Sequence, residues 1–147
     1  MAVKGKFHPQ NPQKYKGNPT NIIFRSSWEF KVMMRFDSDP NIVWWQSEET
    51  VIPYISPVDG KRHRYFPDFL IAVKQPSGLI EKVLIEVKPK NQVIEPVKIG
   101  QKPSKKYIRE VMTYGVNSAK WTAAEAFCKY HGYTFQILTE TEIYGKK

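Results

Sequence analysis

Apolar residues recur at every fourth position in the range 26–37, and this spacing predicts an amphipathic helix. Trp28, Val32 and Phe36 would share its apolar face. An S-x-x-E capping box opens the segment and an aspartate–proline pair closes it, because proline disfavours helical geometry in the residue before it. The pattern therefore predicts a single helix near the start of the chain.

Four segments with strand-like patterns follow this helix, at residues 42–46, 50–55, 64–73 and 79–88. The third is apolar at every position from 69 to 73, which is typical of a central strand covered on both faces. The proline within the second segment places that strand at a sheet edge or a bulge.

A lysine-rich loop at residues 89–106 leads to a second predicted helix at 105–130, a strand at 133–138 and a final helical turn. The stripe expected to face the core of the second helix is Ile108, Val111, Met112, Ala119, Ala123, Ala126 and Phe127. The order α-β-β-β-β-α-β predicts an α/β fold of the α+β type, with a mixed central sheet flanked by helices.

The net charge of the chain indicates a class of binding partner. The chain has 147 residues, enough for one compact domain, and its 23 Lys+Arg against 14 Asp+Glu give a net charge of +9. Such an excess indicates either a polyanion partner, most often nucleic acid, or an ordinary basic domain. One cysteine and three scattered histidines exclude an internal disulfide and a cysteine-cluster zinc site. No apolar run reaches membrane-spanning length and no signal peptide is evident, so we expect no membrane partner.

Residues 1–20 read as a basic N-terminal arm, followed by a single domain at residues 21–147. The arm carries four lysines and no acidic residue, and its prolines and glycines argue against a helix or central strand. It would wrap a phosphate backbone, lie across another protein, or remain a solvated tail. Phe7 and Tyr15 indicate that part of it docks on the domain.

Asp68, Glu86 and Lys88 form the candidate chemical site. Asp68 begins the apolar run of one predicted strand, and Glu86 and Lys88 share one face of the next. A four-residue loop at 75–78 would put the two carboxylates on opposite faces, whereas an odd loop or a bulge would bring them to one face. We predict the second register. The alternative is a solvated strand end with an isolated turn-side acid.

Two adjacent carboxylates repel each other unless a cation lies between them. Oxygen ligands favour Mg²⁺, with Mn²⁺ as a substitute, and the Val87 carbonyl would add a main-chain ligand. Lys88 would position or deprotonate a water molecule, or stabilise charge on a phosphate. Glu29, on the first helix, is a further candidate acid, and its alternative role is the capping box. This combination suits phosphodiester hydrolysis.

These residues resemble the PD-(D/E)xK nuclease superfamily, and the chain as a whole resembles the head completion nucleases of T-even-type tailed phages. The resemblance rests on residues 4–6, 18–23, 25–29, 45–49, 52–54, 63–69 and 85–89. It implies a restriction-endonuclease-like fold, with Asp68 and Glu86 as metal ligands, Lys88 as the catalytic lysine, and Glu29 as an acid that assists the metal or the water.

The resemblance also implies a metal-dependent DNA endonuclease that acts after DNA packaging and before tail attachment. Double-stranded DNA and head, portal or neck proteins are the implied partners, in the host cytoplasm during assembly or in the virion neck. The alternatives are a structural head-neck protein with little activity and a non-viral repair or transposition nuclease. The candidate DNA-binding residues are Arg62, Arg64, Lys90, Lys102, Lys105, Lys106 and Lys120. Less specific candidates for lining the site or acting as a base are Gln46, Glu49 and His63.

Overall fold

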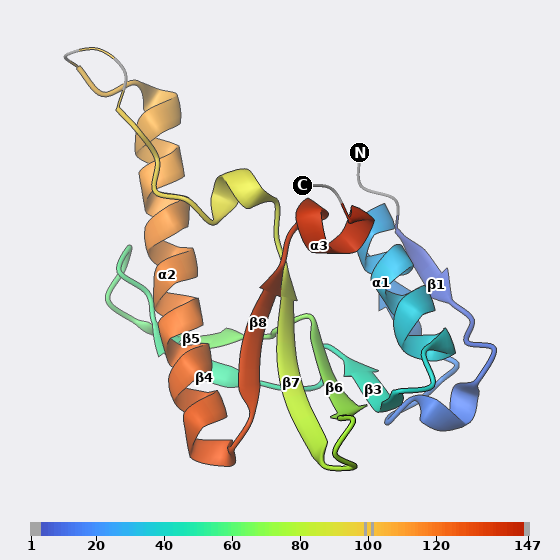
Figure 1. Cartoon of the computed structure of the whole chain (residues 1–147). Coiled ribbons are helices and arrows are strands. Elements are labelled where there is room, and N and C mark those ends of the chain that lie inside the picture. Colours follow the sequence, from blue (N-terminus) through green and yellow to red (C-terminus); the bar gives the residue numbers. More distant parts are fainter. Residues whose placement is uncertain (1–3, 99, 101, 146–147) are drawn as a thin grey trace.

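A four-stranded sheet lies between two helical layers in the computed structural model, which describes residues 4–98, 100 and 102–145 (Figure 1). The strand order is β3 (Ile42–Ser47), β6 (Phe69–Lys74), β7 (Ile80–Val87) and β8 (Thr134–Leu138). β3, β6 and β7 pair antiparallel, and β8 runs parallel to β7. The predicted mixed sheet flanked by helices is therefore confirmed.

One face of the sheet is covered by α1 (Ser27–Ser38) and the short α3 (Glu140–Tyr144). The Ser26 hydroxyl accepts a hydrogen bond from the Glu29 N–H at 3.1 Å and so caps α1. Val32, Met33 and Phe36 of α1 are buried against the sheet, as the four-residue spacing predicts. Their burial fixes the side of α1 that turns toward the sheet.

The other face is covered by α2 (Lys105–His131) and the hairpin of β4 (Ile52–Ile55) and β5 (Arg62–Tyr65). α2 connects β7 to β8, and a crossover of this kind is what a parallel strand pair requires. Gly132 ends α2 in the left-handed conformation, at φ 74°. β4 pairs only with β5 in its two-stranded sheet, so its proline does lie on an edge.

The predicted strand at 64–73 is two strands rather than one. β5 ends at Tyr65 and pairs with β4, whereas β6 begins at Phe69 and joins the central sheet. Pro67, which is fully buried, lies between them and has no N–H to donate to a sheet. The break frees Asp68 from the strand and leaves it at the end of the central sheet.

The apolar stripe predicted for α2 is wrong along the whole helix: none of its seven residues is buried, and Ala123 and Phe127 only pack at the margin of the core. Ile108, Val111 and Met112 are 41–47% exposed, and the residues buried by α2 are Asn117, Trp121, Ala124 and Cys128. The first turns of α2 project beyond the sheet, accompanied only by the preceding loop (Figure 1). The residues that α2 buries lie about half a turn round the helix from the predicted stripe, so periodicity alone selected the wrong face.

The N-terminal residues pack closely on the domain. β1 (Gly5–Phe7) pairs with β2 (Ile22–Phe24), and a short 3₁₀ helix, η1 (Pro12–Lys14), lies between them. Phe7 and Tyr15 are both buried in the core beneath α1, which confirms them as anchors. These two short strands lie among residues rich in proline and glycine, so no strand pattern in the sequence reveals them.

Asp37, at the end of α1, holds the N-terminal segment against the domain through hydrogen bonds. Its carboxylate accepts the backbone N–H groups of Gln10 at 2.8 Å and Asn11 at 3.1 Å. Its backbone carbonyl accepts the Asn11 side-chain amide and the Lys14 ammonium. One buried carboxylate therefore satisfies backbone donors of a segment some 26 residues away.

We expect Asp37→Ala to lower the free energy of unfolding by about 1–3 kcal/mol, because two partly buried N–H groups lose their acceptor. Urea unfolding of the purified variant measures this loss. Glu125→Gln, which changes an exposed carboxylate on α2, serves as the control. Equal stability of the Asp37 variant and wild type would mean that the N-terminal segment is held by its apolar anchors alone.

Candidate active site

The register of β6 and β7 brings the two candidate carboxylates together. Lys74 pairs with Ile80, so the turn between them has five residues, which is the odd loop length predicted from sequence. Continued to the other end of the hairpin, the same register sets Asp68 opposite Glu86. The predicted register is confirmed, and both residues lie where β7 leaves the sheet.

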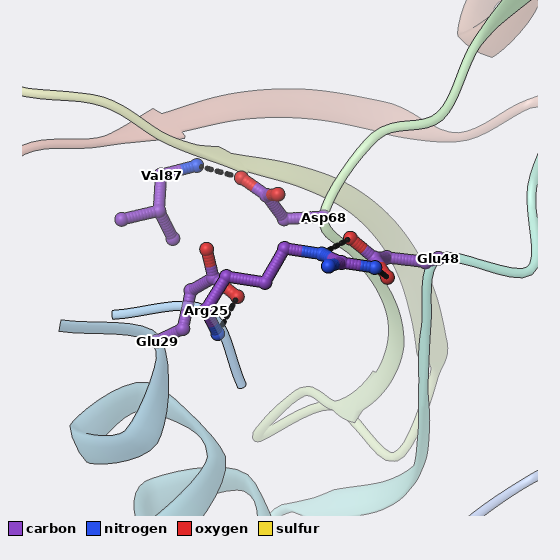
Figure 2. A network of polar contacts seen from close by, with 5 residues as sticks. All are labelled: Arg25, Glu29, Glu48, Asp68 and Val87. Atoms are coloured by element: carbon purple, nitrogen blue, oxygen red, sulfur yellow. Dashed lines mark hydrogen bonds and ion pairs between the residues drawn. The ribbon is translucent and has the colours of Figure 1, made fainter. Parts of the chain in front are cut away.

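Asp68 is held by two backbone contacts. Its Oδ2 accepts the Val87 N–H at 2.7 Å, and its carbonyl accepts the Glu48 N–H at 3.0 Å (Figure 2). Burial raises the pKa of the Asp68 carboxyl well above its usual range, and the charge of Glu86 raises it further, against the opposing bond from Val87. The side chain is thus fixed in position while its negative charge is poorly compensated.

Glu86 is the less exposed of the two carboxylates, with 6% of its surface exposed. Its Oε1 accepts a hydrogen bond from the Tyr65 hydroxyl at 2.6 Å. Burial raises the pKa of Glu86, and the Tyr65 bond and the charges of Lys88 and Lys120 act in the opposite direction. Burial of a carboxylate of this kind is expensive without such partners.

Lys88 follows directly after β7 and lies next to Glu86. Its Nζ is 3.7 Å from Glu86 Oε2, and its backbone N–H donates to the Leu138 carbonyl at 3.0 Å. The second contact continues the parallel pairing of β7 with β8 and fixes the direction of the lysine side chain. The strand alternation that predicts Glu86 and Lys88 on one face therefore holds.

Glu29 reaches the same region from the first turn of α1 (Figure 2). Its Oε1 accepts the backbone N–H of Arg25 at 3.1 Å, whereas a full capping box would use the N–H of Ser26. Burial raises the pKa of Glu29, and the charges of Glu48 and Glu86 also raise it. The residue therefore takes part in both roles weighed from the sequence: it helps order the start of α1 and faces the other acids.

The donor set fits a divalent cation that prefers oxygen. Burial is the main cause of the raised pKa values of Asp68, Glu86 and Glu29, and neighbouring carboxylates raise those of Asp68 and Glu29 further. Within residues 4–98, 100 and 102–145, no three acidic, histidine or cysteine side chains are close enough to form a closed metal cage. Mg²⁺ commonly uses one or two carboxylates and keeps several waters, so Asp68 and Glu86 with the Val87 carbonyl would suffice.

The candidate DNA-binding residues fall into two groups. Lys120 lies near the site, with its Nζ 5.6 Å from the centre of the Tyr65 ring, and its charge acts on Glu86. Arg62 and Arg64 are exposed on β5, on the strand face opposite to Tyr65, and Arg64 lies over the Phe66 ring. Lys90 opens the short 3₁₀ helix η2 (Lys90–Gln92) directly after β7.

Lys102, Lys105 and Lys106 are remote from this group. Lys105 and Lys106 open α2, whose first turns project beyond the sheet (Figure 1). The loop lysines therefore do not all surround the acidic cluster, by which we mean Glu29, Asp68 and Glu86. The reason is that the loop runs along α2 to the start of that helix, far from the sheet.

The less specific candidates make contacts elsewhere. Gln46 donates its side-chain amide to the Lys16 carbonyl at 3.1 Å and so holds the N-terminal segment. His63 bonds Asp59 at 2.8 Å within the β4–β5 hairpin. Glu49 lies near Tyr15 and Gly17. These three residues are engaged with the N-terminal segment or the hairpin rather than with the acidic cluster.

Sequence analysis did not single out Tyr65, Arg25 or Glu48 as part of the site. The available signal for Tyr65 was an aromatic residue at the end of a basic segment, three positions before Asp68. The Arg25–Glu48 pair spans 23 residues, and nothing in the linear pattern joins the two. Such long-range pairs become visible only once the strands are placed.

Comparison with known proteins gives two matches. Residues 39–140 match the family model described as "TnsA-like endonuclease N terminal", a span that contains Asp68, Glu86 and Lys88 and begins after Glu29. The chain is 41% identical over 141 residues to the head completion nuclease of Enterobacteria phage T4, covering 95% of this chain and 93% of that protein. Both the predicted resemblance and the restriction-endonuclease-like fold are thereby confirmed.

We expect Asp68→Asn to stabilise the protein at neutral pH in EDTA, on the order of 1–2 kcal/mol, since it removes a charge whose pKa is raised by folding. A carboxyl whose pKa is higher in the folded state binds its proton more tightly there. The stability of the wild type therefore falls as pH rises from the unfolded-state pKa of Asp68 to its folded-state pKa. The gain should vanish below the ordinary pKa of aspartate, where both states of the wild type are protonated. Urea unfolding of both proteins between pH 3 and about 8 checks this.

The amide of the variant can still accept the Val87 N–H, so its structure should be kept. A variant that is less stable than wild type at neutral pH, or a gain in stability independent of pH, would contradict the inference that the charged Asp68 carboxylate destabilises the folded state.

Proposed function

The chain belongs to the TnsA-like endonuclease family, and from that premise we propose that it is a metal-dependent DNA endonuclease that acts in phage head completion. The observation that supports this most directly is the convergence of Asp68, Glu86 and Lys88 at the end of one hairpin. Glu86 and Lys88 are neighbours on one face of β7, and the register of the hairpin brings Asp68, 18 residues earlier than Glu86, opposite them.

The proposed reaction is hydrolysis of a phosphodiester. Water attacks phosphorus, the bond from phosphorus to one sugar oxygen breaks, and the products are a phosphate monoester and a sugar hydroxyl. A divalent cation bound at this site would supply Lewis-acid stabilisation of the phosphate oxygens and make water more acidic. Asp68, Glu86 and the Val87 carbonyl would hold it, with Glu29 beside them.

The chain's own residues then have separate tasks. Lys88, 3.7 Å from Glu86, would orient the attacking water or stabilise the charge that develops on the phosphate. Tyr65 would keep Glu86 in position through its hydroxyl. Glu29 would bind or orient water from the α1 side. Lys120 would bind a phosphate next to the site, and Arg62 and Arg64, exposed on β5, would bind phosphates further along the duplex.

The place of action follows from the same premise. The relative of 41% identity is named for head completion, so we propose that this chain acts on packaged double-stranded DNA, with head, portal or neck proteins as partners. Assembly in the host cytoplasm, with retention in the virion neck, is the corresponding location. Within the part of the chain that the structure describes, no helix has both the length and the apolar character needed to cross a membrane.

We expect purified protein to cleave linear or supercoiled DNA with Mg²⁺ or Mn²⁺ and to be inactive in EDTA. Asp68→Asn and Lys88→Ala should each lower the cleavage rate by about 10³-fold, because several kcal/mol of transition-state stabilisation are lost. Gel-based cleavage rates measure this directly. Isothermal titration calorimetry with Mg²⁺ should show binding to wild type and weaker binding to Asp68→Asn.

Glu125→Gln again provides the carboxylate control, since Glu125 is exposed on α2. Identical background cleavage by wild type and Asp68→Asn would reject the enzyme. In that case DNA binding without cleavage, and normal assembly of phage carrying Asp68→Asn, would support the structural head-neck alternative.

A further inference from the structure

Arg25 lies at the edge of the acidic cluster and makes a two-point contact there. It directly precedes the N-cap of α1, and its Nε and Nη2 donate to the two carboxylate oxygens of Glu48 at 3.0 and 3.1 Å (Figure 2). Its backbone N–H donates to Glu29. A single arginine thus joins a proposed site residue to a second acid outside the proposed metal ligands.

Glu48 is held in a costly backbone conformation to make this contact. Its φ is +56°, in the left-handed region, and among the described residues it is the one non-glycine with positive φ. Conformations of this kind persist only when surrounding contacts enforce them, and they cluster at functional sites. Here the enforcing contact is the Glu48 N–H to the Asp68 carbonyl.

The Arg25 guanidinium has N–H donors that Glu48 does not use. Arginine has five N–H donors, and Glu48 uses two of them in a planar fork. The side chain is 52% exposed, and its charge interacts with Glu29 and Asp68 as well as with Glu48. An exposed surface ion pair alone contributes little stability, so stability does not account for the strained backbone of Glu48.

We propose that Arg25 binds a phosphate of the DNA at the cleavage site and that Glu48 is the positioning residue that orients its guanidinium. The fork geometry of arginine suits bidentate contact with phosphate, and the donors not used by Glu48 would make it. The inference rests on the nuclease function proposed above. It adds a binding residue at the start of α1, whereas Tyr65 and Lys120 belong to the α2 side of the sheet.

Binding of a short fluorescent DNA duplex in EDTA tests Arg25 without any cleavage. We expect Arg25→Ala to weaken binding about 10- to 100-fold and to reduce the slope of log K against log salt by about 1. Lys74→Ala is the matched control: it also removes one positive charge, but at the far end of β6. Its slope should equal that of wild type.

Glu48→Asn separates positioning from stability, because asparagine tolerates the left-handed region and lacks the charge. Its unfolding midpoint should not fall, whereas its kcat with Mg²⁺ should drop about tenfold. Removal of a negative charge would by itself tighten DNA binding, so a lowered kcat identifies orientation of Arg25. In the Arg25→Ala background, Glu48→Asn should have no further effect on kcat.

Wild-type affinity and salt slope in Arg25→Ala would overturn the phosphate contact, and additive effects in the double variant would overturn the positioning role of Glu48. These outcomes are distinct from failure of the nuclease function. If Asp68→Asn cleaves like wild type, the nuclease proposal fails while the EDTA binding result still reports on Arg25.

Discussion

The register of the β6–β7 hairpin is the constraint on which the site depends. A slip of one residue would turn every side chain of β7 to the other face of the sheet, because strand side chains alternate. Glu86 would then leave Tyr65 and Lys120, and Leu84 would leave the core under α2. The packing of the two cores and the placement of the acids are therefore specified by the same turn, closed by the Gln75 N–H to the Leu79 carbonyl at 2.8 Å.

Contacts from several elements partly compensate the buried negative charge of the carboxylates around this hairpin. The Val87 N–H and the Tyr65 hydroxyl bond the two central acids directly, and Lys88 lies beside one of them. Arg25 and its backbone supply the corresponding contacts on the α1 side. Even with these contacts, the pKa values of Asp68, Glu86 and Glu29 stay above their ordinary range. Keeping these carboxylates charged therefore costs folding free energy, and a cation bound between them would relieve that cost.

The parts of this arrangement that follow local rules were predictable from the sequence. The periodicity of α1, the central position of β6 and the parity of the hairpin all depend on residues close together in the chain. The break at Pro67, the buried face of α2 and the role of Tyr65 depend instead on which distant strand or helix lies alongside. Ile108 belongs to the apolar stripe predicted for α2, whereas the buried Trp121 lies on another side of the helix, and only the position of the sheet decides which side is covered.

The projection of α2 has a consequence for how much DNA the protein must cover. Lys105 and Lys120 are separated by fifteen residues of continuous helix, or about 22 Å along its axis. That exceeds the screening length of roughly 8 Å at physiological salt, so charges at the far end of α2 act on nucleic acid only by touching it. Under the proposed function, a duplex that contacts both Lys120 and Lys105 would extend about six to seven base pairs along the helix. On the same proposal, a shorter fragment would therefore be held by the residues around Asp68 alone.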